Sequence, residues 1–309
     1  MGNGMYCFQI TEETEEERID KFLSGRMESL SRSYIQKLLK DGIVLVNGVP
    51  AKANYRVKYE DEIRLELPPA EEPDIKPEKI PLDILYEDED VLVVNKPKGM
   101  VVHPAAGHYT GTLVNAVMEH CKGNLSGING VMRPGIVHRI DRDTTGSVII
   151  CKNDFSHSNI AAQLKEHTVV RRYRAICCGV LKEDRKTVCA PIGRHPLERK
   201  KMAVNEKNGK HAVTHVEVLQ RFQNHTYIEC RLETGRTHQI RVHMASIGHP
   251  LLGDSVYGGA GKIGKALSYP LEGQCLHAQI LGFCHPRTGQ YVETDAPLPE
   301  YFRNLLKVL

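Results

Sequence analysis

The chain has 309 residues, of which 41% are hydrophobic and 26% are charged, as in ordinary globular proteins. Its formal net charge is only +3, so any binding of nucleic acid has to depend on local basic patches. No apolar run reaches the roughly 18 residues of a membrane-spanning helix, which argues against a membrane protein. Nine cysteines without a CxxC pair, and an acidic N-terminal stretch without a signal-peptide pattern, predict reduced thiols and a cytoplasmic protein.

Residues 1–68 have the pattern of a small domain with two helices and a short sheet. Apolar residues repeat at helical spacing in residues 19–23 and again in residues 35–39. The Asn47-Gly48 pair predicts a hairpin turn, and residues 63–67 alternate as a strand. The next segment, residues 69–82, is rich in proline and charge, and it predicts an extended linker to a second domain at residues 83–309.

Basic residues beside the second predicted helix allow two interpretations, a solvated face of a generic α/β module or an RNA-binding face. The segments RIDKFLSG, SRSYIQKLLKDGIVLVNG and YEDEIRLELP together resemble the αL RNA-binding domain of the ribosomal-protein S-four type. That resemblance implies that Arg32, Lys37 and Lys40 lie on the RNA-facing helix. Side chains of this kind contact phosphates and position RNA without reading its sequence.

A charged turn in the second domain, residues 138–146 (HRIDRDTTG), lies between apolar segments and precedes a predicted buried strand. Asp141 either caps backbone amides in this turn or carries chemistry. The positive charges of Arg139 and Arg142 favour the ionised carboxylate, which is a nucleophile or a base and a poor acid. No second carboxylate nearby looks like its proton-donating partner, which argues against a two-carboxylate glycosidase.

Two further stretches combine positive charge with features of nucleic-acid binding. Tyr173 stands among arginines in the predicted strand VVRRYRAICCGV, either as an exposed aromatic on a sheet or as a platform on which a base stacks beside phosphates. The loop at residues 194–211 holds the densest run of positive charge, either solvated or in contact with an RNA backbone. Its candidate contacts are Arg199, Lys200 and Lys201.

The motif LETGRTHQIRVHMASIGHPLLGDSVYG, residues 232–258, predicts a helix capped by Thr237 and ended by Gly248. Its two histidines, His238 and His243, are five residues apart, which does not fit a zinc-binding pair on one helical face. No metal site is therefore expected here. Each histidine is better explained by ordinary hydrogen bonding.

Four segments of the second domain together resemble the RluA/RluD family of RNA pseudouridine synthases. HRIDRDTTG is similar to the family's HRLDxxTSG signature, and NKPKGMVVHP, RYRA and the 232–258 motif stand in the family's order. The resemblance implies that Asp141 is the catalytic aspartate, that Tyr173 stacks on the target base and that Arg236 pairs with Asp141. It also implies that Ile240 forms part of the pocket wall, and that Arg139 fills the space left by the extruded nucleotide or grips a phosphate.

The resemblance implies an α+β protein, in which a small αL RNA-binding domain precedes a pseudouridine-synthase fold with a mixed, mainly antiparallel sheet and a central cleft. The expected substrate is structured RNA, either large-subunit (23S-type) ribosomal RNA, free or in a pre-ribosomal particle, or transfer RNA. Isomerisation needs no cofactor, and a monomer is expected. The alternatives are a non-catalytic RNA-binding assembly protein, which the presence of Asp141, Tyr173 and Arg236 disfavours, and a nucleoside or DNA glycosylase.

Overall fold

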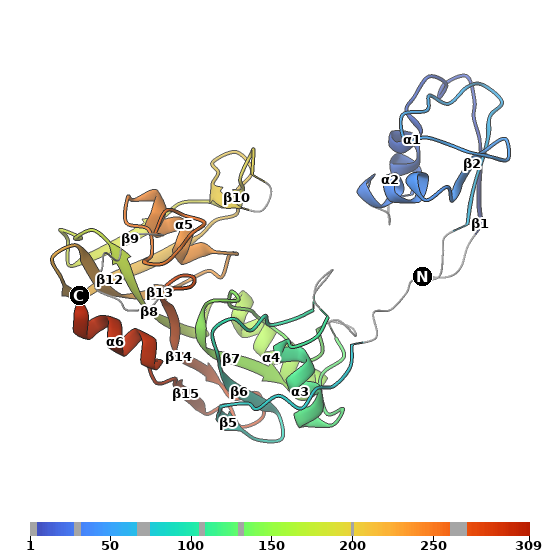
Figure 1. The fold of residues 1–309 in the computed structure, drawn as a ribbon. Helices are drawn as coiled ribbons and strands as arrows, with labels where there is room; N and C mark the ends of the chain where they lie inside the picture. Colours follow the sequence, from blue (N-terminus) through green and yellow to red (C-terminus); the bar gives the residue numbers. More distant parts are fainter. Residues whose placement is uncertain are drawn as a thin grey trace. The chain divides into compact units, whose positions relative to one another are not determined.

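The structure, a computed structural model, divides into two compact units, Met1–Glu72 and Pro73–Leu309. It describes residues 5–27, 32–66, 75–104, 109–128, 133–198, 201–259 and 271–309. Figure 1 shows the helices and strands of the two units. No helix in these ranges is both long enough and apolar enough to cross a membrane.

The first unit consists of two helices and a four-stranded antiparallel sheet with strand order β1-β4-β2-β3. Its helices are α1 (Ile19–Arg26) and α2 (Arg32–Lys40), and its strands are β1 (Met5–Gln9), β2 (Val44–Val46), β3 (Val49–Pro50) and β4 (Glu62–Glu66). The hairpin predicted at Asn47-Gly48 joins β2 to β3, and both residues have positive φ, as a tight hairpin turn requires. Strand β1 lies in a stretch where no strand was predicted.

A buried carboxylate joins the two helices of the first unit. The Asp20 side chain is fully buried in α1 and accepts hydrogen bonds from Arg18 (3.0 and 3.1 Å), Arg32 (2.9 and 3.1 Å) and Gln36 (2.7 Å). Burial alone would raise the pKa of Asp20, but these bonds outweigh it and hold the pKa below its usual value of 3.8. Asp20 therefore connects α1 to the start of α2.

The second unit contains a nine-stranded sheet in the order β5-β6-β7-β14-β8-β13-β12-β9, with β15 paired to β14. The pairing of β7 with β14 is parallel and the other pairings are antiparallel, so the prediction of a mixed, mainly antiparallel sheet is confirmed. The strands are β5 (Ile84–Glu87), β6 (Val91–Lys96), β7 (Thr145–Cys151), β8 (Val170–Cys178), β9 (Arg185–Cys189), β12 (Val213–Arg221), β13 (His225–Leu232), β14 (Leu276–Cys284) and β15 (Tyr291–Asp295). A separate hairpin pairs β10 (Ile192–Arg194) with β11 (Met202–Val204).

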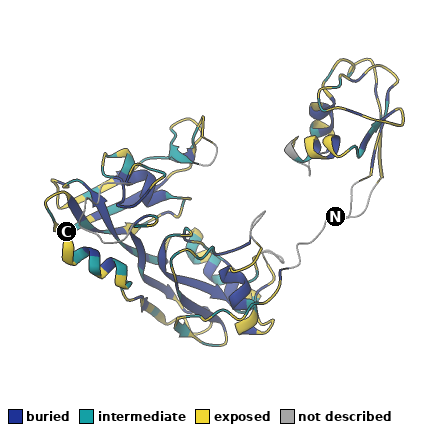
Figure 2. Ribbon diagram, viewed as in Figure 1, coloured by how far each residue is buried: buried dark blue, intermediate teal, exposed yellow. Residues whose placement is uncertain are grey.

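Helices cover both faces of this sheet, which explains why its central strands are buried along most of their length (Figure 2). Helices α3 (Leu113–Cys121) and α5 (Gln239–Ser246) pack on one face, against side chains such as Val148 and Ala175. Helices α4 (Asp154–Lys165) and α6 (Glu300–Val308) pack on the other face, against side chains such as Phe283 and Ile176. Successive residues of one strand therefore belong to different cores.

The predicted linker is partly incorporated into the second unit. Ile75 is 5% exposed and belongs to the core beneath α3, because Asn115 of that helix donates to the carbonyl of Lys76 at 2.8 Å and accepts from the backbone N–H of Glu78 at 2.9 Å. Residues 75–78, part of the extended linker expected over residues 69–82, thus pack against the second unit. The preceding part, residues 67–74, lies outside the described residues.

Candidate active site

A cavity of about 570 Å³ lies where the segment before β7, the first half of β8 and the start of α5 meet. Asp141, Tyr173 and Ile240 all line it, so three residues predicted from separate motifs share one site. Among the described residues, Asp141 is the one carboxylate of the lining, against six basic side chains. These are Arg133, Arg139, Lys165, Arg171, Arg236 and Arg241. A cavity with this charge favours a polyanionic ligand.

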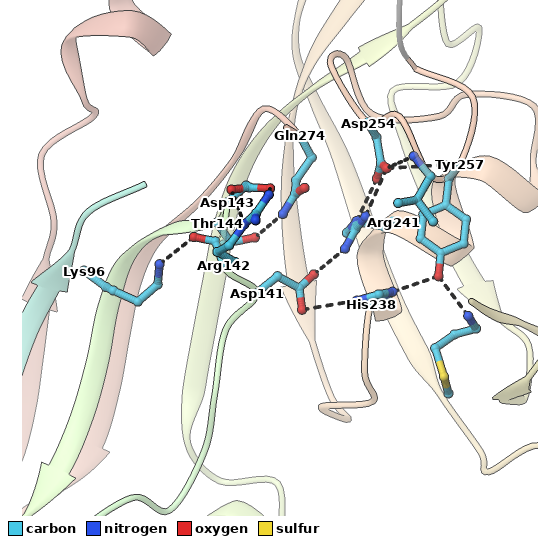
Figure 3. Close-up of polar contacts among 12 residues, drawn as sticks. Lys96, Asp141, Arg142, Asp143, Thr144, His238, Arg241, Asp254, Tyr257 and Gln274 are labelled. Atoms are coloured by element: carbon cyan, nitrogen blue, oxygen red, sulfur yellow. Dashed lines mark hydrogen bonds and ion pairs between the residues drawn. The ribbon is translucent and has the colours of Figure 1, made fainter. Parts of the chain in front are cut away.

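Lys96, at the end of β6, binds the backbone of the loop that carries Asp141. The Lys96 side chain is fully buried, and its ammonium donates to the carbonyls of Pro97 (2.8 Å), Met100 (2.8 Å) and Arg142 (2.9 Å), as Figure 3 shows for Arg142. Burial lowers the pKa of Lys96 to about 7, although three carbonyls fit the three protons of an ammonium group. The lysine of the NKPKG segment therefore has a structural role, since it holds the backbone of the Asp141 loop.

The loop is also fixed from the side of β14. Gln274 donates to the hydroxyl of Thr144 at 2.9 Å, and the N–H of Thr144 bonds to the carbonyl of Asp141 at 3.1 Å. Gly146 has φ +107° and lies so close to the backbone of Ala278 that any side chain there would collide with it. The glycine of the HRIDRDTTG motif is thus required by the approach of two strands.

The guanidinium partner of Asp141 is Arg241 and not Arg236. Nη1 of Arg241 lies 2.9 Å from Oδ2 of Asp141 (Figure 3). Nε of Arg236 instead donates to the carbonyl of His211 at 3.0 Å. The predicted pairing is wrong because the segment before α5, which begins at Gln239 after His238 and not after Thr237, directs Arg236 to the backbone of His211. Arg241 then lies in the first turn of the helix, buried beside Ile240, while Arg236 remains before the helix on the cavity wall.

Arg241 is held rigidly by a second carboxylate. Asp254, 1% exposed, accepts from Nε and Nη2 of Arg241 at 2.7 and 3.0 Å, and it also accepts the N–H groups of Val256 (3.0 Å) and Tyr257 (3.2 Å). Burial alone would lower the pKa of Arg241, but the hydrogen bonds and charges of Asp254 and Asp141 outweigh burial and raise it. The guanidinium is therefore permanently charged and presents Nη1 to Asp141.

His238 lies on the other side of the Asp141 carboxylate. Its Nε2 is 3.7 Å from Oδ1 of Asp141, beyond hydrogen-bond range, and its Nδ1 is 2.8 Å from the Tyr257 hydroxyl. Because that hydroxyl accepts the N–H of Met202 at 3.0 Å, its own proton is free to go to Nδ1 of His238, which leaves the ring proton on Nε2, facing Asp141. Burial lowers the pKa of His238, which favours the neutral ring.

Three other residues predicted for the site line the cavity, and the second histidine of the 232–258 motif does not. Tyr173 is 8% exposed on β8, Ile240 is 3% exposed on α5, and Arg139 contacts Nε2 of His103 at 3.2 Å, all within the cavity lining. Burial raises the pKa of Tyr173 and keeps the phenol neutral. His243 is not in the lining, because its ring is buried and bonded to Thr214 (2.9 Å) and Ala190 (3.0 Å), as expected for a structural histidine.

The residues predicted to contact the RNA backbone lie elsewhere. Arg32 pairs with Asp20, and Lys37 and Lys40 are exposed on α2. Lys201 pairs with Glu198 at 2.8 Å. The predictions for Arg199 and Lys200 lie outside the described residues.

Sequence reasoning missed Arg241, Asp254 and the His238–Tyr257 pair. A signal for Arg241 was present, because it follows Ile240 and precedes Val242 in a helix whose neighbouring positions are apolar. A cation buried in that way needs a carboxylate partner. Nothing local pointed to Asp254, whose role depends on the turn after α5.

Comparison with known proteins gives two family matches. Residues 90–246 match the model described as RNA pseudouridylate synthase, and residues 17–63 match the S4 domain. The chain is 54% identical over 299 residues to the uncharacterized RNA pseudouridine synthase YlyB of Bacillus subtilis (strain 168), covering 97% of this chain and 96% of that protein. It is 47% identical over 305 residues to the ribosomal large subunit pseudouridine synthase D of Zymomonas mobilis, covering 97% and 96%.

A solved structure gives a similar result for the fold. Human RNA pseudouridylate synthase domain containing 1 aligns with a TM-score of 0.56 and 28% sequence identity, covering 71% of this chain and 84% of that chain.

Proposed function

Because the chain belongs to the RNA pseudouridylate synthase family, whose members convert uridine to pseudouridine in RNA, we propose that it acts on large-subunit ribosomal RNA with Asp141 as the catalytic group. The chain is thus an isomerase with an RNA substrate, and its S4 domain is a second RNA-binding element. The choice of ribosomal RNA is supported by relatives named ribosomal large subunit pseudouridine synthase D, which are 42–47% identical over most of the chain.

One observation carries the assignment of Asp141. It is the one carboxylate among the described lining residues, with a single guanidinium bond to Oδ2 and with Oδ1 beyond hydrogen-bond range of His238. Its side chain is 17% exposed, so the carboxylate is both accessible and held in place. A carboxylate oxygen held in place at the wall of a cavity is the arrangement that a nucleophile or a base requires.

The reaction breaks the bond between ribose C1′ and uracil N1 and forms a bond between C1′ and C5. The proton on C5 is lost to solvent and N1 gains one, so the atoms balance without a redox partner. The uridine has to leave its stack to reach a cavity of this kind. Tyr173 then supports the base, Arg139 lies where it meets the backbone or the vacated space, and Arg241 fixes the Asp141 carboxylate.

Three first steps are compatible with this geometry. Asp141 attacks C1′ of the sugar, adds to the base, or removes a proton from the ribose. All three need the carboxylate oxygens that Arg241 holds in place. A glycosylase that used the same carboxylate to activate water would release free uracil, which an isomerase does not.

The test is tritium release from RNA labelled at uracil C5, with large-subunit ribosomal RNA and transfer RNA as parallel transcripts. We expect release from ribosomal RNA by the wild type and none by Asp141→Asn, which still binds the RNA. Release from transfer RNA alone would overturn the substrate assignment. Appearance of free uracil would indicate a glycosylase, and an active Asn variant would exclude Asp141 as the catalytic group.

A further inference from the structure

Strand β8 separates the three arginines that surround Tyr173. Because side chains alternate along a strand, Arg171 and Tyr173 lie on the same face of the sheet and line the same cavity. Arg172 and Arg174 lie on the opposite face. There Arg174 pairs with Glu229 at 2.8 Å, and Arg172 faces Glu293 at 3.5 Å.

Arg171 differs from both neighbours in burial and in partners. Arg171 is buried, with 7% of its surface exposed, whereas the side chain of Arg172 is 36% exposed. Nη2 of Arg171 donates to the backbone carbonyl of Glu233 at 3.1 Å. Nε of Arg171 is buried without a hydrogen-bond partner, as is Nε of Arg172, so the difference in partners lies in the ion pairs. No ion pair joins Arg171 to a carboxylate in the described part of the chain, and the carboxylate of Glu233 itself pairs with His215 at 2.6 Å.

A buried guanidinium without a counter-charge is costly to fold. Burial lowers the pKa of Arg171, yet a guanidinium stays protonated at any physiological pH, so its charge has to be compensated by another group. One neutral carbonyl does this only in part. The backbone makes room for the group, because a side chain on Gly235 would press on Nη1 of Arg171.

The other basic side chains of the cavity do not share this condition. Arg241 is neutralised by Asp254 and Asp141. Arg133, Arg139 and Lys165 are exposed to water, and Arg236 is half-buried. Arg171 is thus the buried cation of the lining that lacks a carboxylate partner among the described residues. It stands two residues from the tyrosine proposed to support the base.

We propose that Arg171 binds a phosphate of the RNA backbone next to the uridine that stacks on Tyr173. This inference rests on the proposed function, since it takes the cavity as the place where the extruded nucleotide binds. The nucleotide is then held at two points, the base by Tyr173 and the backbone by Arg171. An RNA phosphodiester supplies the anion that the protein does not, and the planar fork of Arg171 suits it.

The experiment compares Arg171→Met with Arg172→Met, which removes the same charge one residue away on the opposite face. For Arg171→Met we expect KM for the RNA to rise about tenfold, the size of a single charge-assisted contact of about 1.4 kcal/mol. The slope of log Kd against log salt should fall by about 0.7, the value for one phosphate contact on a single strand. Arg172→Met should leave both quantities within twofold of wild type.

Thermal unfolding separates this role from a structural one. Removal of an uncompensated buried cation should leave Tm unchanged or raise it, whereas loss of a structural arginine should lower Tm. Arg171→Lys should recover part of the affinity, because it restores the charge without the fork. An unchanged KM and salt slope in Arg171→Met, or a fall in Tm with RNA binding intact, would overturn the proposal.

The two proposals fail in different ways. If the wild type releases no tritium from either transcript, the proposed function is wrong, and the salt slope of RNA binding still reports on Arg171. If the wild type is active and Arg171→Met has wild-type KM and slope, only the phosphate site is wrong.

Discussion

Asp20 of the first unit and Asp141 of the second are both aspartates bound by arginine. They differ in how many hydrogen bonds their carboxylate oxygens accept. Asp20 is fully buried and accepts five hydrogen bonds from Arg18, Arg32 and Gln36. Asp141 is 17% exposed and accepts one guanidinium bond, while its second oxygen faces a cavity. A carboxylate whose two oxygens both accept hydrogen bonds holds structure together, and one with an oxygen left without such a bond is available for chemistry.

The largest expected effect comes from removing the reactive carboxylate. Asp141→Asn should lower kcat by a factor on the order of 10⁴ or more, the scale seen when a nucleophile or base is deleted. RNA binding and Tm should change little, because Arg241 keeps its bidentate bond to Asp254. The matched control is Asp143→Asn, whose carboxylate pairs with the exposed Arg142, and it should retain near-normal tritium release. Equal losses in both variants would remove the distinction between the two aspartates.

The next effect concerns the group that orients Asp141. Arg241→Lys keeps the charge but not the fork that joins Asp254 to Asp141, so kcat should fall about 10- to 100-fold, the range found for supporting groups of active sites. KM should stay within about threefold of wild type. Steady-state tritium release measures both constants. Arg236→Lys should cost clearly less, and the reverse order would restore the pairing first expected for Arg236.

Asp20→Asn should affect stability and not chemistry. The half-exposed guanidinium groups of Arg18 and Arg32 lose their counter-charge in this variant. We therefore expect the first unit to lose about 1–3 kcal/mol of unfolding free energy. Hydrogen exchange of amides in α1 and α2 of the full chain measures the loss. Glu17→Gln, which removes an exposed pair with Lys21 at 3.3 Å, should cost no more than about 0.5 kcal/mol.

The stabilisation that Asp20 contributes also depends on pH, and Asp20→Asn tests this. The pKa of Asp20 in the folded chain lies below its usual value of 3.8, so its stabilisation is fully present above the unfolded-state pKa. That stabilisation is lost as the pH falls through the folded-state pKa. Exchange in α1 should therefore accelerate below about pH 4 in the wild type, relative to the intrinsic rate. Asp20→Asn should lack this dependence, and an identical profile in both chains would assign the acid sensitivity to another group.

The smallest effect is expected at Tyr257. Tyr257→Phe removes the hydroxyl proton that goes to Nδ1 of His238, a loss of about 1 kcal/mol, or roughly fivefold in kcat. His238 then becomes free to change tautomer, so the pH profile of kcat should shift while KM does not. Without any shift in the profile, His238 would be a passive wall of the cavity.

The sequence predicted the residues whose role depends on local pattern. The turn around Asp141 stands out as charge between apolar segments, and Asn47-Gly48 specifies a hairpin by its backbone preferences. The mixed sheet was expected from family resemblance. Neither pattern nor resemblance gave the partner of Asp141, because Arg236 and Arg241 lie on either side of the start of α5 and the tertiary structure decides which of them meets the carboxylate.

The sequence also did not predict which side chains become buried through contacts with distant parts of the chain. Alternation in β8 implied that Arg171 and Arg172 lie on opposite faces, but which face met the cavity depended on strands far along the chain. Ile75 looked like part of a free linker because its neighbours are prolines and charges, yet α3 offers it an apolar site.

Two of the three restraints on the Asp141 loop come from residues synthesised long after it. The bond from Lys96 spans 46 positions, that from Arg241 spans 100, and that from Gln274 to Thr144 spans 130. Contacts of such separation form late, after the local hairpins. A growing chain that has emerged only to β13 possesses Asp141 but neither Arg241 nor Gln274 to hold it. The Asp141 loop thus gains its bonds to Arg241 and Gln274 only after those two residues have been synthesised, near the end of translation.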